Sequence, residues 1–562
     1  MEKSETAQVR YNRRLSGLKL ERESFTNHWT ELSDFILPRR GRFLTTDRNS
    51  GAKKNSKILD DTATLAVRTL VSGMVSGMTS PARPWFRLGA PISDLMENAS
   101  VKMWLDEVEE LMREIFSRSN LYNALPQMYE ELAVFGTAAM LVVEDYEDVI
   151  RCHPYTIGEY YIGTNQRGEV DTVYREMSMT VAQVINTFGK ENCSTSVRDR
   201  WESGAVDTWV DVIHVIEPND ERNPKLSDAK NMPYVSVYYE PKGELDRCLR
   251  KSGFQEFPAM APRWNVMHPD IYGRSPGMES LGDVKQLQTE QKRKAQAIDK
   301  MSNPPLIGDG QLKTEVISVL PGGLSFADLS QSSPGLKPVY QVDPRINELM
   351  LDIQQTQERI ERSFYADLFL MTARSDRRQV TAREINERHE EKLLAIGPVL
   401  SRTHSELLKP LIDRTFAIMF RAGIVPDPPQ ELQDTELRVE FISMLAQAQK
   451  AVDTGGIERL LGYVSNAAQF NPDILDKFDF DQSVDHYSSL LGTMPDLVRD
   501  DEAVEEIRAA RIAAQQQQMR AQMQANMAQS AKTLADADTS GKNALTDLVE
   551  MADRGEMPNA AA

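Results

Sequence analysis

The chain contains one short motif that is typical of a serine nucleophile, Gly273-Arg274-Ser275-Pro276-Gly277. It fits the G-x-S-x-G pattern, in which a sharp turn between a strand and a helix exposes the serine and the next residue's backbone N–H lines the oxyanion hole. Here that next residue is Pro276, which has no backbone N–H to donate. The motif therefore predicts a defective oxyanion hole, and a serine esterase using Ser275 is the enzymatic alternative against which other functions are weighed.

The chain also lacks the sequence motifs of a zinc site and of a nucleotide-binding loop. Cys152, Cys193 and Cys248 lie far apart without C-x-x-C spacing, which is typical of a reducing compartment and gives no zinc site. The seven histidines form no H-E-x-x-H motif, and no G-x-x-x-x-G-K-[ST] loop occurs. We therefore expect a protein that is not an enzyme and has no metal, no cofactor and no ATP hydrolysis of its own.

Basic side chains gather in two stretches that could contact nucleic acid. One is an expected loop between two long helical patterns, and the other is an earlier helical stretch. The members are Arg374, Arg377 and Arg378 in the loop, and Lys285, Lys292, Lys294 and Lys300 in the helix. Such residues either contact phosphates or pair with nearby carboxylates on a solvated face, and the residue types alone leave both interpretations open.

Length and charge narrow the classes of protein. With 562 residues, 41% of them hydrophobic and 27% charged, the chain is long enough for two to four globular domains. A net charge of −19 argues against a broad DNA-gripping surface but allows a channel with a few local basic contacts. No charge-free apolar run reaches the ~18 residues that span a bilayer. The polar start lacks a signal peptide, so we expect a cytoplasm-like environment.

Hydrophobic spacing predicts a mainly helical chain with a β-rich segment, an α+β fold. Helices are expected over about 5–40, 58–78, 98–118 and 121–140, followed by short strands from about 141 to 270 with one inserted helix near 180–189. In the proline-rich "TSPARPWFRLGAP", Trp85 and Phe86 are expected to pack in a core or between subunits, because base stacking serves single strands.

Two long helical patterns flank a compact insert. The first starts at Pro276 and continues to about Met301, and the second carries apolar residues from Ile346 to Phe364. The proline-rich stretch between them, 303–344, would then lie at the end of a stalk. A later helix contains Gly397-Pro398, which should kink it. The Gln- and Ala-rich tail from about 498 is expected either to pack against copies of itself or to be partly disordered.

Four stretches in a fixed order resemble the portal, or head-to-tail connector, proteins of short-tailed bacteriophages. They are "SGMVSGMTSPARPWFRL" (72–88), "YGRSPGMESLGDVKQLQTEQ" (272–291), "NPPLI" (303–307) and "VTAREINER" (380–388), and the spacing is similar from about residue 5 to about 420. The resemblance implies a portal fold with wing, stem, clip and crown, assembled as a closed ring of about twelve subunits around a central channel.

The resemblance also implies a division of the chain. The expected parts are an N-terminal helical part of the wing (1–140), a β-rich wing segment (141–275), a first stem helix (276–302), the clip (303–344), a second stem helix (345–368), a tunnel loop (369–380), a long kinked wing helix (381–423), a wing or crown segment (424–497) and a helical crown or tail (498–562). In this division Gly273, Pro276 and Gly277 form the turn that launches the first stem helix.

The implied function is a ring at one capsid vertex through which double-stranded DNA is packaged and ejected. Arg374, Arg377 and Arg378 would face the DNA from the tunnel loop, and the stem lysines would line the channel, without reading sequence. The implied partners are a terminase motor, major capsid and scaffolding proteins and a tail adaptor, in the host cytoplasm during assembly and in the virion afterwards. A scaffold or tail protein that forms open oligomers is the structural alternative.

Overall fold

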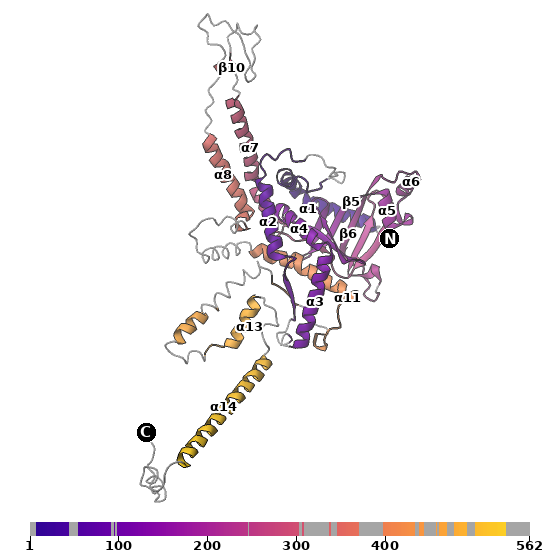
Figure 1. Ribbon diagram of the computed structural model, residues 1–562. Helices are drawn as coiled ribbons and strands as arrows, with labels where there is room; N and C mark the ends of the chain where they lie inside the picture. The colour runs from indigo at the N-terminus through magenta and orange to yellow at the C-terminus, as the bar shows by residue number, and fades with distance from the viewer. Residues whose placement is uncertain are drawn as a thin grey trace. The chain divides into compact units, whose positions relative to one another are not determined.

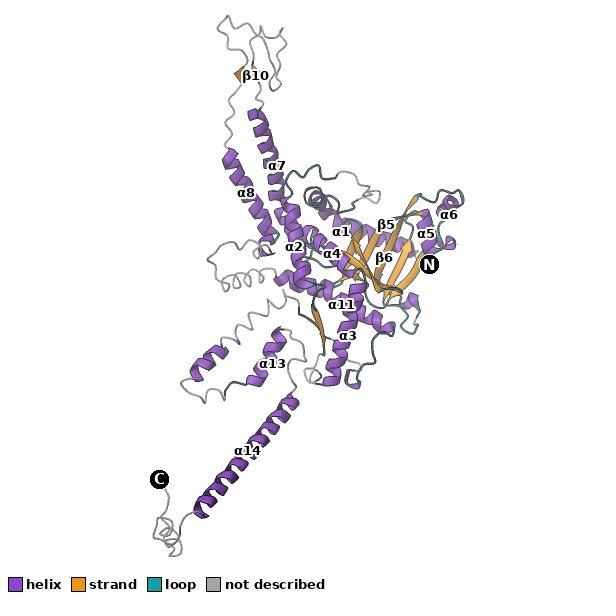
Figure 2. Ribbon diagram, viewed as in Figure 1, coloured by secondary structure: helices purple, strands orange, loops and turns teal. Residues whose placement is uncertain are grey.

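The computed structural model divides the chain into two compact units, Met1–Leu460 and Leu461–Ala562. It describes residues 7–43, 54–90, 95, 98–226, 228–244, 247–302, 306–307, 337–338, 346–369, 397–432, 438–442, 457, 460–468, 477–491 and 501–535. Over these residues the chain is mainly helical, with antiparallel sheets (Figures 1 and 2).

The helices and strands of the first unit alternate along the chain. Its helices are α1 (Ala7–Phe35), α2 (Thr62–Met78), α3 (Ala99–Arg118), α4 (Leu121–Phe135), α5 (Val181–Phe188), α6 (Thr195–Glu202), α7 (Pro276–Ser302), α8 (Ile346–Ser363) and α11 (Lys409–Arg421). Its strands are β1 (Phe86–Gly89), β2 (Ala139–Asp145), β3 (Val149–Tyr155), β4 (Tyr160–Thr164), β5 (Val170–Thr180), β6 (Trp209–Pro218), β7 (Tyr234–Tyr239), β8 (Arg250–Phe254), β9 (Ala259–Met260), β10 (Leu306–Ile307), β11 (Lys337–Pro338) and β12 (Arg438–Phe441).

A continuous hydrophobic core joins α1, α2, α4, α7 and α8. Trp29 of α1, Met74 of α2 and Phe135 of α4 are fully buried in it. A side chain at Gly73 would collide with the ring of Phe369, so the missing Cβ lets the chain after α8 lie directly on α2. Trp85 is also buried in this core, which is one of the two places expected for it from the sequence. Its ring meets the neighbouring Phe86 ring edge-on, with the ring centres 4.7 Å apart.

The β-rich segment forms two antiparallel sheets. The larger, among the orange strands of Figure 2, has the order β4-β5-β6-β7-β8. Tyr11, Leu15 and Leu18 of α1 pack on one of its faces. The smaller has the order β3-β2-β9. On β3, the side chain of Asn120 binds both the N–H and the C=O of Cys152, at 2.8 and 2.7 Å, and so covers backbone groups that could pair with another strand.

Three of the differences from the sequence expectation concern the inserted helices, α4 and β1. The β-rich segment holds two inserted helices, because Ser194 caps the additional helix α6. Helix α4 ends at Phe135 rather than near 140, since Gly136 adopts a left-handed conformation with φ of 78° and β2 begins at Ala139. The third difference is β1, which pairs antiparallel with β12. No local pattern marks a four-residue strand whose partner lies some 350 positions away.

The helices α7 and α8 form an antiparallel hairpin beside α2 (Figure 1). Arg359 of α8 pairs with Asp283 of α7 at 3.3 Å. Of the stretch 303–344 between the two helices, only β10 and β11 are described, and they pair with each other antiparallel. The proposed clip otherwise lies outside the described residues.

The second unit contains α13 (Phe480–Leu491) and the long helix α14 (Asp501–Ala535). Arg508 of α14 holds both carboxylate oxygens of Asp481, at 2.6 and 2.8 Å. The side chains of Met519 and Met523 on α14 are exposed. No helix in the described part of the chain has both the length and the apolar character that crossing a membrane requires.

A buried carboxylate joins helix α4 to the chain between β3 and β4. Glu131 is 1% exposed and accepts hydrogen bonds from the Thr156 hydroxyl at 2.7 Å and the Ile157 N–H at 2.9 Å. Burial raises the pKa of Glu131 to about 7, although both donors favour the charged form. This carboxylate therefore orients the loop but is costly to keep ionised.

We predict that Glu131→Gln changes how stability depends on pH. Because the folded-state pKa of Glu131 is raised, the unfolded state loses its proton first, and the wild type loses stability as the pH rises from about 4.5 to about 7. Gln cannot titrate, so the variant does not lose this stability. Its unfolding free energy relative to that of wild type should therefore rise by on the order of 3 kcal/mol as the pH increases across this range. Denaturant titrations followed by tryptophan fluorescence at a series of pH values measure this, and a pH-independent difference would contradict it.

Candidate functional site

Ser275 caps a helix and is not accessible as a nucleophile. Its side chain donates a hydrogen bond to the Val134 carbonyl at 2.6 Å and accepts one from the Met278 N–H at 3.1 Å. Helix α7 begins at the next residue, Pro276, where a missing N–H costs nothing because the first turn leaves that group unpaired. Since Ser275 is only 1% exposed, its Oγ is not accessible to an ester. The geometry gives the esterase alternative no support.

Glycines bring the start of α7 into direct backbone contact with the end of α4. A Cβ on Gly277 would lie 2.6 Å from the Val134 carbonyl oxygen, and one on Gly273 would collide with the Gly136 carbonyl. The Gly273 N–H also donates to the Thr137 hydroxyl at 2.9 Å. Thus the sequence-predicted Gly273, Pro276 and Gly277 lie together where α7 begins.

A second serine is adjacent to a histidine, but this pair is not suited to catalysis. Ser236 lines a cavity of about 970 Å³ between the large sheet, β2, β3 and α11, and its hydroxyl lies 2.9 Å from Nε2 of His214. Burial, reinforced by Arg175 and Arg250, lowers the pKa of His214 to about 3. A group with that pKa is a poor general base at neutral pH, so the buried pair is better explained as part of the core.

A polar cluster ties the hairpin to the start of α2. One oxygen of Asp60 accepts hydrogen bonds from Gln291 of α7 at 2.7 Å and from Gln357 of α8 at 2.9 Å, while the other accepts from the Thr62 N–H at 2.9 Å. Burial acts to raise the pKa of Asp60, but these donors and the Thr62 hydroxyl hold it below its usual value. The charged carboxylate therefore fixes both helices of the hairpin against α2.

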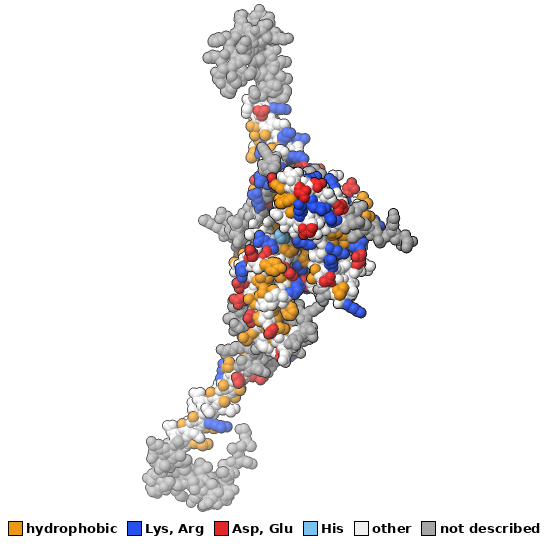
Figure 3. All heavy atoms as spheres, turned by 90° about the vertical axis from the view of Figure 1, so that its right-hand side faces the viewer, with side chains coloured by type: hydrophobic (Ala, Val, Ile, Leu, Met, Phe, Trp, Pro, Cys, Tyr) orange, Lys and Arg blue, Asp and Glu red, His pale blue; other side chains and the backbone are white. Residues whose placement is uncertain are grey.

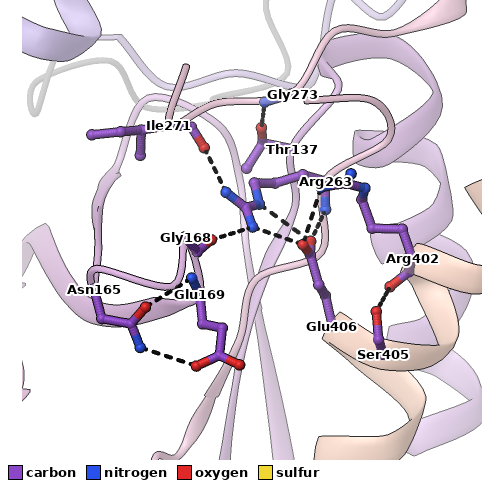
Figure 4. Close-up of polar contacts among 10 residues, drawn as sticks. All are labelled: Thr137, Asn165, Gly168, Glu169, Arg263, Ile271, Gly273, Arg402, Ser405 and Glu406. Carbon is purple, nitrogen blue, oxygen red and sulfur yellow. Dashed lines mark hydrogen bonds and ion pairs between the residues drawn. The ribbon is translucent and has the colours of Figure 1, made fainter. Parts of the chain in front are cut away.

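A partly buried ion pair joins the loop before α7 to the helix that contains α11 (Figure 4). Glu406 accepts three hydrogen bonds from Arg263, from the backbone N–H at 2.9 Å, from Nε at 3.2 Å and from the terminal guanidinium nitrogen at 2.7 Å. That guanidinium also donates to the carbonyls of Gly168 and Ile271. Arg263 thus connects the β4–β5 turn, the loop that leads to α7 and the later helix.

The predicted channel lysines have different surroundings. Lys285 forms an ion pair with Glu31 of α1 at 2.6 Å, and its ammonium lies 5.7 Å from the centre of the Phe35 ring. Lys292 and Lys300 are exposed and Lys294 is partly exposed, and none of these three pairs with a carboxylate in the described part of the chain. Figure 3 shows Lys and Arg side chains gathered just below the uppermost grey atoms, with acidic and basic groups mixed on the wider face beneath.

The remaining predicted residues are only partly covered. Arg374, Arg377 and Arg378 lie outside the described residues, so their place facing DNA stays a prediction. Gly397 and Pro398 open a described helical stretch, 397–403, but the residues before them are not described, and the expected kink there stays a prediction as well. The irregularity that is visible in this helix is a π-helical turn at His404–Leu408.

Reasoning from the sequence missed Arg263, Glu406 and Asp60. Arg263 and Glu406 lie 143 positions apart, and each resembles an ordinary charge of a solvated loop or helix face. A weak signal existed for Asp60, because it forms with Asp61 an aspartate pair just before Thr62, and aspartates there are a common helix N-terminus pattern. Nothing local in the sequence indicated its contacts with Gln291 and Gln357. Among the described residues, no three His, Cys, Asp or Glu side chains cluster as a metal site would require.

Comparison with known proteins decides which family this architecture belongs to. The family model described as bacteriophage head to tail connecting protein matches residues 8–498. The chain belongs to this family.

Two relatives of this connector protein are similar over almost their whole length. It is 49% identical to the probable portal protein of Bordetella phage BPP-1 over 535 residues, covering 95% of this chain and 96% of the relative. It is 47% identical to the portal protein of Salmonella phage epsilon15 over 550 residues, covering 98% of this chain and 99% of the relative. A chain from the virion of a native gene transfer agent particle matches with 12% identity and a TM-score of 0.35, covering 83% of this chain and 99% of that one. Only the sequence relatives carry the assignment.

We predict that Ser275→Ala lowers stability and leaves ester hydrolysis unchanged. The change removes the cap of α7 and the bond to Val134, which should cost about 1–2 kcal/mol of unfolding free energy. Denaturant unfolding and a p-nitrophenyl acetate assay measure the two effects. Ser363→Ala is the matched control, because among the described residues its hydroxyl bonds only to the Arg359 carbonyl in its own helix. Hydrolysis by wild type that vanishes in Ser275→Ala would restore the esterase alternative.

Proposed function

We propose that this connector protein is a phage portal protein, the component at one capsid vertex through which double-stranded DNA is packaged and ejected. One observation carries the proposal: identity of 47–49% along nearly the full length of two proteins named portal proteins. Relatives this similar over the whole chain share their fold. The capped serine and the weakly basic histidine are consistent with a role that does not involve catalysis.

The portal architecture extends to the parts of the chain. We assign α7 and α8 to the stem, 303–344 to the clip, 369–380 to the tunnel loop and 498–562 to the crown or tail, with the wing formed by 1–275 and 381–423 and a wing or crown segment at 424–497. The antiparallel α7–α8 hairpin supports the stem assignment, because the chain leaves along one helix and returns along the other. The Asp60 cluster supports it further, since a stem must be held firmly at its base.

The proposed mechanism is electrostatic and does not read sequence. A chain with a net charge of −19 repels phosphates on balance, which would let DNA slide without sticking. Contact is then left to local basic groups, for which we propose the tunnel-loop arginines and the exposed stem residues Lys292 and Lys300. Lys285 is a weaker candidate, because Glu31 already neutralises it.

This mechanism requires partners. We propose that the copies form a closed ring of about twelve, docked to the major capsid and scaffolding proteins at the portal vertex, in the host cytoplasm during assembly and in the virion afterwards. The energy for packaging must come from a separate terminase, which would contact the clip before a tail adaptor takes its place. An open oligomer, as formed by other virion proteins, is the competing assembly.

The mass of the purified assembly separates these two structures. A closed ring of twelve chains of 63.5 kDa should have a mass of about 760 kDa and appear as uniform rings in negative-stain images. Native mass spectrometry on the same sample gives the subunit number. Filaments of variable length would indicate heterologous contacts that do not close and would favour the open-oligomer alternative.

We predict that replacing Arg374, Arg377 and Arg378 together by alanine leaves the ring intact but impairs packaging or retention of DNA. Each ring would lose about three dozen positive charges from its lumen if twelve subunits contribute. The length of the packaged genome, measured by pulsed-field electrophoresis of virion DNA, tests this. The control is Arg118→Ala with Arg151→Ala, exposed arginines of the wing that pair only with nearby carboxylates. A normal genome length and yield in the triple variant would exclude the tunnel-loop assignment.

A further inference from the structure

A cavity in the first unit has the size and the lining of a small-molecule site. It measures about 970 Å³ and lies between the five-stranded sheet, the strands β2 and β3, and α11. Pockets that bind small molecules enclose about 300–1,000 Å³ and combine mainly apolar walls with a few polar groups in fixed places. The apolar wall here includes Leu141, Val143, Met177, Phe188, Phe254 and Ile418. The polar groups that share this space then decide what kind of ligand fits.

One row of side chains crosses the sheet beside the cavity. Its cross-strand pairs are Arg175 of β5 with His214 of β6, His214 with Tyr238 of β7, and Tyr238 with Arg250 of β8. Residues directly opposite each other in neighbouring strands share one face of a sheet. Of these four, Arg175, Tyr238 and Arg250 line the cavity. The His214 and Tyr238 rings are stacked with their centres 3.8 Å apart, so an arginine stands on each side of a stacked pair.

The guanidinium of Arg175 is not matched by a close carboxylate. It lies over the ring of Tyr155, 4.0 Å from the ring centre. In the described part of the chain its closest carboxylate is that of Glu159, 3.6 Å from a terminal nitrogen, which is beyond hydrogen-bond distance. The same oxygen of Glu159 lies 3.8 Å from Arg42, so one carboxylate is shared between two cations. The buried Nε of Arg175 has no hydrogen-bond partner among the described residues either.

Arg250 at the other end of the row is also without a carboxylate partner among the described residues. Its guanidinium donates to the carbonyl of Thr187 at 2.7 Å and lies 5.2 Å from the centre of the Phe188 ring. Both of these neighbours also line the cavity. A carbonyl and a ring face leave the positive charge of Arg250 uncompensated, and its remaining N–H groups can donate to a ligand.

The charges on the opposite wall compensate one another. Arg414 pairs with Glu256 at 3.2 Å, and Arg421 pairs with both Glu256 and Glu144. The carboxylate of Asp145 accepts hydrogen bonds from backbone N–H groups of its own turn. The surplus of positive charge in the cavity therefore comes from the two arginines of the sheet.

The histidines of this region respond to that surplus. Burial, followed by Arg175 and Arg250, lowers the pKa of His214 to about 3. Burial, followed by Arg175 and Arg151, also lowers the pKa of His153, which lines the cavity. Surroundings that oppose the binding of a proton favour the binding of an anion.

We propose that this cavity binds a small molecule that carries an anionic group on an aromatic body. The anionic group lies over the row between Arg175 and Arg250, where the positive charge is uncompensated. The aromatic body lies against Met177, Phe188 and Phe254, which supply apolar and ring surface. This inference goes beyond the proposed function and holds whether or not the copies close into a ring.

A pair of matched probes tests the site on the purified full-length protein. Anilinonaphthalene sulfonate is an aromatic anion whose fluorescence rises in apolar surroundings, and phenylnaphthylamine has the same rings without the charge. Wild type should bind the sulfonate at one saturable site per chain. Arg175→Met and Arg250→Met should each raise the Kd of the sulfonate by about tenfold, because each removes a charged hydrogen-bond donor. Both should leave the Kd of the amine within about twofold, because the apolar wall is unchanged.

Two further variants locate the probes and control for general charge effects. Ser252→Trp places an indole in the cavity from β8, the last strand in the sheet order, and should weaken both probes by at least about tenfold. Arg118→Met removes an exposed arginine of α3 that pairs only with Glu114, and should change neither Kd. Circular dichroism and the unfolding midpoint establish that each variant is folded. If Arg175→Met does not fold, Arg250→Met decides alone, since Arg250 is exposed.

Several results would overturn the proposal. Without saturable binding of the sulfonate by wild type, there is no such site. An unchanged Kd in the folded arginine variants, or an equal loss for both probes in them, would exclude an anion site. A loss of the same size in Arg118→Met would indicate general charge attraction, and full affinity in Ser252→Trp would place the probes elsewhere.

Discussion

The close contact between residues 134–137 and 273–277 is the constraint on which the rest of the first unit depends. Backbone meets backbone there, so no side chain larger than hydrogen fits at Gly273 or Gly277. Gly136 turns the chain from α4 into the strand β2, and Ser275 and Pro276 start α7 at the same place. The direction of the hairpin is therefore set at its origin, by a junction that allows little adjustment.

Partly buried charges then fix the elements around this junction. The Arg263–Glu406 pair and the Asp60 cluster each join segments that are far apart in the chain. Replacing such a pair by apolar groups can be neutral for stability, whereas removing one partner is strongly destabilising. Their value here lies in orientation, because hydrogen bonds have direction and apolar contacts do not. A hairpin that must keep one angle against the body benefits from such contacts.

These features agree with a structural component of the virion. The serines that might attack a substrate are buried, one as a helix cap and one beside a histidine whose pKa is about 3. The interactions at the base of the hairpin hold its two helices in place against the start of α2. In the proposed portal, these interactions would connect the stem that surrounds DNA to the wing.

The sequence by itself determined the properties that are covalent or local. Pro276 has no N–H in any fold, and this covalent fact alone argues against the esterase. Helical periodicity placed α7 and α8, and four ordered motifs pointed to the family. Only the tertiary structure decided the pairing of Arg263 with Glu406, of Lys285 with Glu31 and of β1 with β12. Each of these joins residues far apart in the chain, and a charged side chain looks alike in sequence whether it faces solvent or a buried partner.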